Sequence, residues 1–428
     1  MLTVSNLYLL VYALSWTFFL YKNSKNGKFT LSYSMIALYT VLSFVSIFLF
    51  NSEEAKFNFE SEISLLPLIY LYVSIILCIY PLIKLEESKI KVLLIPSEQR
   101  LKFFSWICII LAFYGISDML PQIQSGFMVM FSDSDAITEL YEESTALRKD
   151  GVSSAGSSMF FSLLNIMSNQ AKNLVPFFLF INLINPKKNK YTTWLLMLSA
   201  LQMPLSGIAH ASRLELIVSF LAIILLFFFF KPYLASNVKA KIYKVFSVIG
   251  GCIAFIFIVI TFARVSTGGA TSTVYNFASY LGQSTIVFDQ YCLDANGTRE
   301  GNLVAPLLLR AVGKKTLTEN EIRDKYSFMR VNNASFSTFV GDMVLDFGPI
   351  LAFILIVIFS IVCSSYLQNK GTLTFGQLIV IYLVLRFSSG FYQLQYCCMS
   401  GNITFVILLM FAFCGKSLSS NQVYRIQK

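Results

Sequence analysis

Charged residues are scarce in this chain. They make up 13% of its 428 positions, whereas hydrophobic residues make up 56%. A soluble domain usually carries about 25% charged residues, because its surface must be solvated. The deficit runs along the whole chain instead of being confined to one terminal stretch. This composition excludes a soluble enzyme with a membrane tail.

Common catalytic and metal-binding motifs are also missing. The sequence contains one histidine, no P-loop, no CxxC pair and no Ser/His/Asp signature. Its eight cysteines are scattered, mostly inside apolar runs, as is typical of buried small hydrophobic residues. The net charge of +10 could indicate nucleic-acid binding, but in a membrane protein it more often reflects orientation. We therefore expect no metal, no cofactor and no nucleic-acid partner.

What the sequence does contain is a series of long apolar runs. Many reach roughly 18 residues, enough to cross a hydrocarbon core about 30 Å thick as a helix. Because the runs are continuous and do not alternate, they predict helices and not a barrel. We expect an all-α polytopic integral membrane protein, a single membrane domain over residues 1–428 with about 11 transmembrane helices, in a range of roughly 10 to 12. The expected helices lie near 2–21, 29–50, 63–83, 103–120, 157–184, 191–209, 213–230, 245–263, 349–367, 376–397 and 399–415.

Lysine and arginine gather in alternate short connections between these helices. The positive-inside rule places the basic set in the cytoplasm, with the N-terminus outside and the C-terminus inside. The connection 51–62, on the opposite side, is acidic. The basic set comprises Lys22, Lys25 and Lys28; Lys84, Lys89, Lys91, Arg100 and Lys102; Lys187, Lys188 and Lys190; Lys231, Lys239, Lys241 and Lys244; Lys370; and Lys416, Arg425 and Lys428.

Two outer connections are long. Residues 121–156 contain an acidic amphipathic stretch from Asp133 to Glu143, expected to form a short surface helix. Residues 264–348 form the largest polar region and, from their length, predict a folded cap. Long connections with structure of their own are often functional.

Charged side chains inside expected spans are functional candidates, because each costs a few kcal/mol at mid-depth. Arg386 lies near the middle of 376–397, with polar residues at four- and three-residue spacing that predict one polar helix face. Such a face could bind a ligand or pack against another helix. Lys172, in the span 157–184, could bind a ligand, pair with a carboxylate or reach the interface. The polar face comprises Tyr382, Arg386, Ser389, Gln393 and Tyr396.

Further charges lie at the outer ends of helices. A short turn carries His210, Arg213 and Glu215, and Arg264 follows another apolar run. Either arginine could simply anchor a helix end among lipid headgroups. Together with Arg386, however, they predict an anion site open to the outer leaflet, since guanidinium groups match phosphate geometry. A lipid-linked diphosphate fits such a site.

The cap ends in a pair of aspartates. Asp342 and Asp346 are four residues apart and are expected to share a helix face. They could supply a general base, hold arginines in place or be solvated. Earlier in the cap, Arg330 precedes Asn332 and Asn333, whose amides could bind sugar hydroxyls.

This layout resembles the Wzy-type O-antigen and capsule repeat-unit polymerases of bacteria. The likeness covers nearly the whole chain: a Phe/Ile/Leu-rich polytopic sequence, one large outer connection in the C-terminal half and a short acidic one earlier. Locally it rests on His-Ala-Ser-Arg-Leu-Glu (210–215), Phe-Ala-Arg (262–264) and Gly-Asp-Met-Val-Leu-Asp-Phe-Gly-Pro (341–349). The paired arginine-and-glycine loop motif of some members does not transfer, because position 280 is Tyr280.

The resemblance implies a glycosyltransferase of the bacterial inner membrane, with a fold similar to polyprenyl-carrier-dependent (GT-C-like) enzymes. Such polymerases join undecaprenyl-diphosphate-linked repeat units at the periplasmic face without a metal, often with a chain-length-regulating co-polymerase. Carried onto this chain, the resemblance makes Arg213, Arg264 and Arg386 diphosphate-binding candidates. The base would be His210, Asp342 or Asp346. Further substrate-binding candidates are Lys172, Glu215, Arg330 and Gln393.

Other functions remain open. An O-antigen ligase would use the same fold and donor. A lipid-linked oligosaccharide flippase or other transporter would also need buried cations, but usually shows internal repeats and broken helices. A membrane O-acyltransferase is normally built around an intramembrane histidine, whereas His210 is expected at the outer edge. The 85-residue cap favours an enzyme.

Overall fold

The computed structural model describes residues 3–24, 30–130, 159–185, 189–209, 213–248, 250–251, 273–331, 336–368 and 371–425. Apart from one small sheet, the regular structure of these residues is helical. Seven of the described helices are long and apolar enough to cross a membrane, judged by length and composition. This is the pattern of a multi-pass membrane protein. These candidate spans are Val4–Asn23, Leu31–Phe50, Leu65–Lys89, Glu98–Asp118, Leu216–Tyr233, Thr338–Tyr366 and Cys398–Gly415.

The chain packs as two compact units. The first comprises Met1–Ser88, Thr271–Asn369 and Ile379–Leu409, and the second Lys89–Ala270, Lys370–Leu378 and Met410–Lys428. The first unit contains α1 (Val4–Asn23), α2 (Leu31–Phe50), α3 (Ala55–Asn58), α4 (Leu65–Lys84), α13 (Thr273–Val287), the π-helical turn η3 (Phe288–Cys292), α14 (Pro306–Ala311), α15 (Glu319–Lys325) and α16 (Thr338–Tyr366). The 3₁₀ turn η1 (Glu87–Lys89) lies at its boundary, and α17 (Phe375–Ser388) and α18 (Cys398–Leu418) contribute residues to both units.

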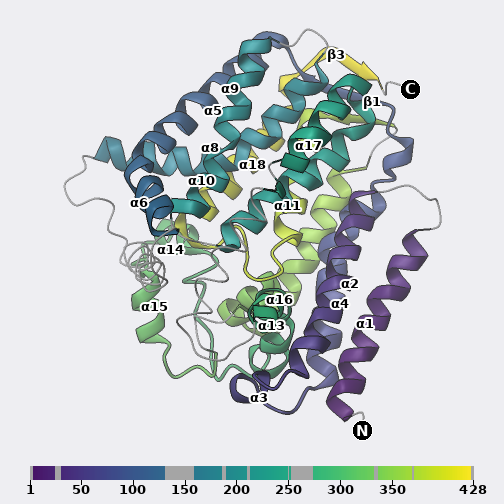
Figure 1. The fold of residues 1–428 in the computed structure, drawn as a ribbon, viewed down its shortest axis with the longest axis vertical. Helices are drawn as coiled ribbons and strands as arrows, with labels where there is room; N and C mark the ends of the chain where they lie inside the picture. The colour runs from purple at the N-terminus through teal and green to yellow at the C-terminus, as the bar shows by residue number, and fades with distance from the viewer. Residues whose placement is uncertain are drawn as a thin grey trace. The chain divides into compact units, whose positions relative to one another are not determined.

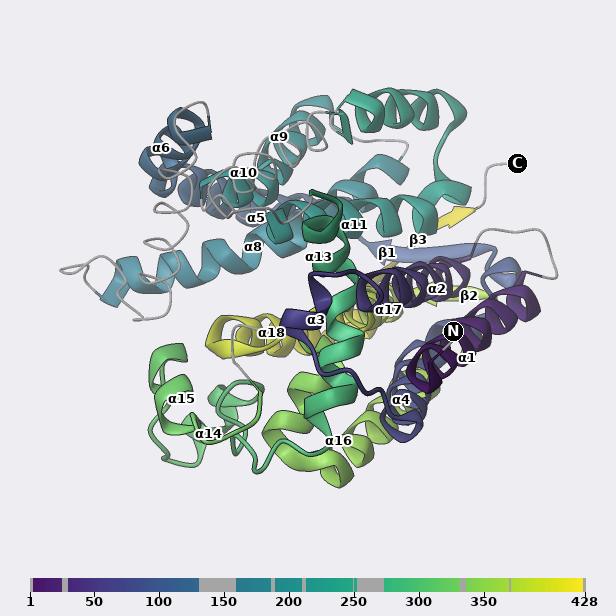
Figure 2. The same cartoon turned by 60° about the horizontal axis from the view of Figure 1, so that its bottom comes forward.

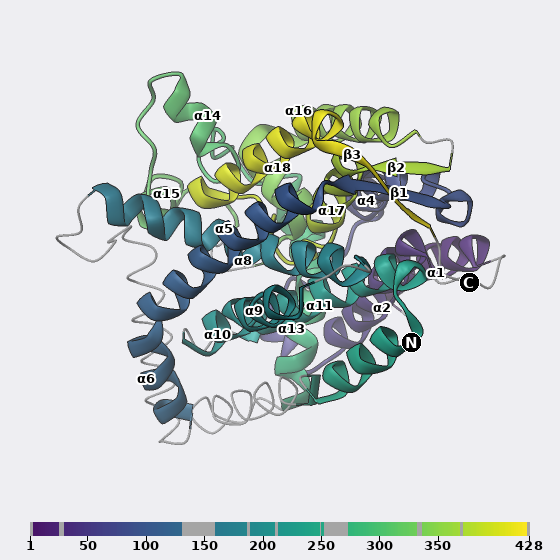
Figure 3. The same ribbon diagram turned by 90° about the horizontal axis from the view of Figure 1, so that it is seen from above.

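The second unit combines helices with the sheet. Its helix α5 packs against α8 and α9, while α10 packs against α11 and α6 (Figure 3). Its elements are β1 (Val92–Pro96), α5 (Glu98–Asp118), α6 (Leu120–Met130), α8 (Met159–Ile184), α9 (Lys190–Ala200), α10 (Gln202–Ala209), α11 (Arg213–Phe230), η2 (Lys231–Tyr233), β2 (Thr372–Thr374) and β3 (Ser419–Arg425).

The exposed faces of the spans are apolar. Along α1 the exposed apolar side chains follow helical spacing and include Val4, Leu7, Val11, Leu14 and Phe18. Along α16 they include Ile350, Ile354, Ile358 and Ile361. Water would solvate such stripes poorly, whereas lipid tails match them. These stripes support the membrane interpretation independently of overall composition.

Helices α1, α2 and α4 run side by side and share an aromatic core (Figure 1). Trp16 stacks on Tyr39 with ring centroids 5.3 Å apart, and its ring meets that of Tyr72 edge-on at 4.8 Å. About two turns further along α2, the Ser46 hydroxyl donates to the Gly282 carbonyl of α13 over 2.9 Å. Small residues at this crossing let the two backbones approach closely, as is common between membrane helices.

We expect Gly282→Ala to destabilise the protein by about 1–3 kcal/mol, because a methyl group would overpack the α2–α13 crossing. The added Cβ would lie 3.0 Å from the Ser46 backbone, which cannot rotate out of the way. Thermal unfolding of the detergent-purified protein measures the effect. Ser279→Ala on the same helix is the control and should shift stability much less. Equal effects of the two substitutions would show that the crossing is not tightly packed.

Helix α16 contains a sharp break. Gly348 has φ 76° and ψ 162°, a conformation that favours glycine, and Pro349 follows. The Tyr70 hydroxyl of α4 donates to the Pro349 carbonyl over 2.6 Å. Figure 2 shows α16 against α4, where this contact is made. The break separates the segment 338–347, with both aspartates, from the apolar span that the sequence predicts at 349–367.

The predicted helix 376–397 is wrong in its second half. Helix α17 ends at Ser388, and residues 389–397 form an irregular, largely buried segment before α18. A Cβ on Gly390 would lie 2.5 Å from the Gln393 carbonyl oxygen, so only glycine fits this tight turn. The expected polar face is therefore wrong beyond Arg386: Ser389, Gln393 and Tyr396 lie on the irregular segment.

The predicted helix 191–209 is also divided, into α9 and α10 around Leu201. Pro204 explains the break, because a proline ring clashes with the carbonyl four residues earlier, here Ala200 at the end of α9. Helix α8 has the expected length, but its polar residues Asn169, Gln170, Lys172 and Asn173 keep it out of the apolar set. Most of the expected helix 245–263 lies outside the described residues.

The helices are accompanied by a small three-stranded sheet in the order β2-β1-β3, which was not predicted from the sequence (Figure 3). Strand β1 pairs in parallel with β2 and antiparallel with β3, with Val92 opposite both Thr372 and Arg425. Val-Leu-Leu-Ile is a short apolar run typical of strands, and Pro96 ends it. All three strands come from connections that the charge pattern assigns to one side of the membrane.

Candidate functional site

Three buried charged side chains of the first unit come together around Arg299. Its Nε lies 2.7 Å from Oδ1 of Asp346, and its terminal nitrogen lies 3.5 Å from Oδ1 of Asp342. The Nε contact is a charge contact without hydrogen-bond alignment. Asp342 and Asp346 face the same arginine because they are four residues apart on the first part of α16, as the sequence predicts. All three side chains are buried.

The two carboxylates also hold backbone segments. Oδ2 of Asp346 accepts hydrogen bonds from the amides of Leu303 (2.9 Å) and Val304 (2.6 Å). Oδ2 of Asp342 accepts one from the amide of Leu394 over 2.8 Å. The cluster therefore ties the turn after Arg299 and the irregular segment 389–397 to the same helix.

The two carboxylates keep Arg299 charged. Burial on its own would lower the pKa of Arg299, but the carboxylates of Asp346 and then Asp342 raise it above its usual value. The sequence left three roles for the aspartates: a general base, a support for an arginine, or a solvated pair. These contacts correspond to the second role. That arginine is Arg299, which was not among the candidates. Catalysis by Asp342 or Asp346 stays a prediction.

Arg386 lies in the last turn of α17, immediately before the irregular segment. Its exposed fraction is 7%, and the phenols of Tyr382 and Tyr396 lie within electrostatic range. A cation here also interacts favourably with the carbonyl end of the helix dipole. With 14 residues, α17 is about 21 Å long, short of a 30 Å hydrocarbon core. Irregular backbone near membrane depth is tolerated where it is buried in protein or lines a cavity.

Gln393 belongs to this segment and is half-buried. Its side-chain amide donates to the sulfur of Cys397 over 3.0 Å. The amide of Leu394, the next residue, is the group that Asp342 binds. Gln393 therefore precedes the anchored residue Leu394 in the irregular segment 389–397, which follows α17.

Arg330 has a different environment. It lies 2.8 Å from the Asp294 carboxylate and 3.2 Å from that of Glu60, and its guanidinium stacks over Tyr291. With 40% of its side chain exposed, it links the cap to the acidic connection 51–62 at the surface. Asn332 and Asn333, the expected partners for sugar hydroxyls, lie outside the described residues.

The remaining candidates belong to the second unit. Lys172 lies half-buried in α8. Arg213 and Glu215 occupy the first turn of α11, and their side chains lie outside the part that the structure describes. His210, Arg264 and the acidic stretch from Asp133 to Glu143 also lie outside it. The convergence of three arginines on a diphosphate therefore stays a prediction.

A further buried carboxylate, Asp289 in η3, was not singled out by the sequence. Oδ1 accepts a hydrogen bond from the Ser64 amide over 2.8 Å, whereas Oδ2 has no partner among the described residues. Neighbouring Gln290 donates to the carbonyls of Glu60 and Glu62. These contacts fix the chain that enters α4, and burial raises the pKa of Asp289 to about 7.

Asp289 predicts a specific pH dependence. Because its folded-state pKa is about 7 against an ordinary 3.8, the folded protein binds the proton more tightly than the unfolded chain. This group therefore makes stability fall as pH rises from about 4 to 7, by at most about 1.4 kcal/mol per pH unit. Unfolding of Asp289→Asn across this window should lack that slope. An unchanged slope would show that Asp289 is already ionised at pH 4.

Among the described residues, no three His, Cys, Asp or Glu side chains come together in a way that could hold a metal ion. Searches against protein-family models, curated proteins and solved structures return no match for this chain. The likeness to repeat-unit polymerases therefore depends on the sequence features alone. What the structure adds is the arrangement around Arg299, Arg386 and the segment 389–397.

Proposed function

We propose that this protein polymerises lipid-linked oligosaccharide repeat units at the outer, periplasmic face of a bacterial inner membrane. The observation that supports this most directly is Arg386, a buried guanidinium at the end of a helix too short to span. It adjoins an irregular segment that Asp342 anchors. A buried guanidinium next to an anchored, non-helical segment is a suitable binding site for the diphosphate group of a polyprenyl-linked substrate.

The proposed reaction is a glycosyl transfer. A hydroxyl oxygen of the acceptor glycan attacks the anomeric carbon of the donor glycan, and the bond from that carbon to the diphosphate oxygen breaks. The hydroxyl proton passes to a base, and undecaprenyl diphosphate leaves with the bonding electron pair. Arg386, with Arg213 and Arg264, stabilises the charge that grows on the leaving group.

In this proposal the base is His210, because the other two candidates, Asp342 and Asp346, are occupied by contacts in the Arg299 cluster. Asp342 and Asp346 are each engaged with Arg299 and with backbone amides. A general base must reach the proton that it takes, at about 2.6–3.2 Å. Both aspartates would have to release their partners first. They serve better as the support that positions the segment 389–397.

A second candidate, a lipid-linked oligosaccharide transporter, gains support from the same region. Transporters often bind substrate where helices are discontinuous, and both the Gly348 break and the early end of α17 are of this kind. An O-antigen ligase would share the polymerase site and donor. The 85-residue cap connection favours a transferase over a transporter.

Gene deletion followed by complementation separates these functions. If the protein is the polymerase, deletion leaves a single repeat unit on the lipid core, and the wild-type gene restores a ladder on a silver-stained gel. Bare core with lipid-linked polymer would indicate the ligase instead. Single lipid-linked units that accumulate on the cytoplasmic side would indicate the transporter and overturn the proposal.

A further inference from the structure

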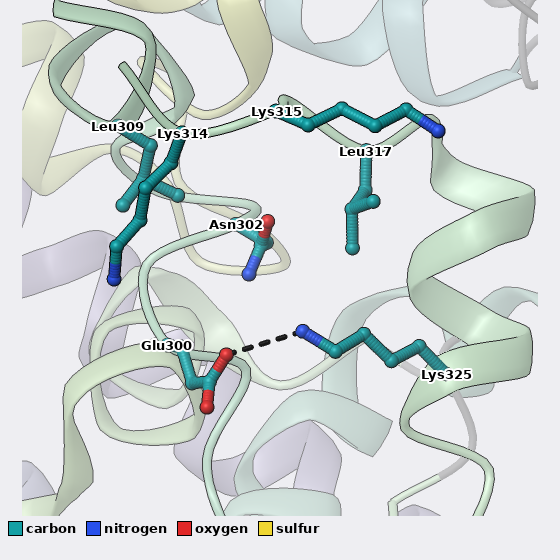
Figure 4. Close-up of a pocket in the computed structure, with 7 residues that line it drawn as sticks. All are labelled: Glu300, Asn302, Leu309, Lys314, Lys315, Leu317 and Lys325. Carbon is teal, nitrogen blue, oxygen red and sulfur yellow. Dashed lines mark hydrogen bonds and ion pairs between the residues drawn. The ribbon is translucent and has the colours of Figure 1, made fainter. Parts of the chain in front are cut away.

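A basic hollow of about 200 Å³ lies in the cap, beside the turn that carries Arg299. Figure 4 shows its lining, which comes from the turn after Arg299, the end of α14 with the irregular segment that follows it, and the end of α15. Its polar lining residues are Glu300, Asn302, Lys314, Lys315 and Lys325, and its apolar ones are Leu309 and Leu317. None of them belongs to the site described above.

Two of the three lysines are neutralised. Lys325 lies 3.2 Å from the Glu300 carboxylate and Lys315 lies 2.7 Å from that of Glu321. Hydrogen bonds from Tyr326 and Lys325 lower the pKa of Glu300, so it is ionised at neutral pH. Lys314 is exposed and forms no ion pair within the described part of the chain. The hollow thus keeps one unbalanced positive charge.

The neutral lining suits a sugar. Asn302 is buried and its amide nitrogen donates to the Arg299 carbonyl and the Tyr326 hydroxyl. Its Oδ1 accepts no hydrogen bond from any described residue, which leaves an acceptor for a ligand hydroxyl at the wall of the hollow. Leu309 and Leu317 supply apolar surface for the C–H face of a pyranose ring.

We propose that this hollow binds the carboxylate-bearing sugar of an acidic glycan. The inference rests on the proposed function, since it makes the hollow a subsite for the repeat unit. One surplus positive charge balances one carboxylate, whereas a diphosphate would leave excess negative charge next to Glu300 and Glu321. The volume also suits a single ring, because sites for drug-sized ligands usually measure about 300–1,000 Å³.

Binding by the full-length protein in detergent tests this directly. Ligand-observed NMR would compare methyl β-D-glucuronide with methyl β-D-glucoside, which differ only in the carboxylate. The glucuronide should bind with a Kd on the order of 1 mM, at least about fivefold tighter than the glucoside, and more weakly at high salt. Equal binding of the two sugars would overturn the proposal. So would displacement of the glucuronide by equimolar inorganic phosphate, which would make the hollow a phosphate or headgroup site.

Variants locate the binding. Lys314→Gln should weaken glucuronide binding about three- to tenfold and leave glucoside binding unchanged, because it removes the surplus charge. Arg323→Gln is the matched control: it removes an exposed cation from α15, in the same cap but outside the lining, and should bind like the wild type. A Lys314→Gln variant that binds normally, with an unchanged thermal midpoint, would place the sugar elsewhere.

This result is independent of the gel assay of function. If glucuronide binds in the hollow but deletion leaves the ladder intact, the polymerase proposal fails and the sugar site stands. If deletion removes the ladder but no acidic sugar binds, the polymerase proposal stands and the sugar site fails.

Discussion

Arg386→Ala should lower the rate of polymerisation by about 10²–10³-fold, enough to remove the ladder from a complemented deletion strain. The guanidinium is buried at the end of α17, where the irregular segment 389–397 begins. Arg386→Lys should retain part of the activity, because it keeps the charge but loses the two-pronged geometry of guanidinium. Gel analysis of surface glycan measures both effects.

Protein level and thermal midpoint are measured alongside, because removal of a buried cation can also affect folding. Arg310→Ala is the matched control, since Arg310 is exposed in α14 and should be dispensable for the ladder. Arg386→Ala with a full ladder would contradict the assignment of Arg386 to the leaving group. Lost polymer together with an unchanged amount of protein in the membrane would support it.

Arg299→Met should destabilise the protein by about 3–5 kcal/mol, because it leaves two carboxylates buried without their cation. Arg330→Met is a close comparison: it removes the same side chain from between two carboxylates, but at an exposed site. Surface ion pairs contribute about 0–1 kcal/mol, so this variant should lose little stability. Thermal or denaturant unfolding in detergent would reveal the difference.

A double variant tests whether the loss of stability in Arg299→Met comes from the buried charges left unpaired or only from the changed side-chain volume. Arg299→Met with Asp346→Asn keeps an acceptor for the amides of Leu303 and Val304 and removes one of the buried charges. It should be more stable than Arg299→Met alone. If it is less stable by the sum of both single effects, the two residues are not coupled and the cluster does not act as a unit.

Much of the helical framework could be predicted from local composition. The apolar run 213–230 coincides with α11, and α1, α2, α4 and α18 begin and end close to the expected residues. Each of these helices is defined by hydrophobicity over a window, which is a local property of the sequence. Residues 399–415, for example, are apolar enough to specify α18 without reference to any partner.

The breaks in the helices depend on features with a weaker sequence signal. Pro204 and the Gly348-Pro349 pair are residues that commonly interrupt helices. Because they lie within continuous apolar runs, the hydrophobicity of those runs still predicts an unbroken helix. The end of α17 depends on Gly390, whose carbonyl accepts a hydrogen bond from Phe339 far away in the sequence. The sheet likewise joins three connections that are distant along the chain. Pairings of this kind have no local signature.

The candidate site shows the same division. The spacing of Asp342 and Asp346 predicts a shared face, and both carboxylates do contact one arginine. Arg299 was missed because it stands 43 residues before Asp342, in an ordinary-looking turn. Its only local signal is the pair of glycines around it, Gly297 and Gly301, both with positive φ. Charge at an isolated turn position does not by itself indicate burial.

The most direct test of the central claim uses the purified protein in liposomes with a defined undecaprenyl-diphosphate-linked repeat unit. The polymerase proposal predicts a ladder of lengthened lipid-linked glycan, release of one undecaprenyl diphosphate for each bond formed, and undiminished activity in excess EDTA. Transfer of intact single units across the bilayer without any lengthening would contradict the proposal and identify a transporter.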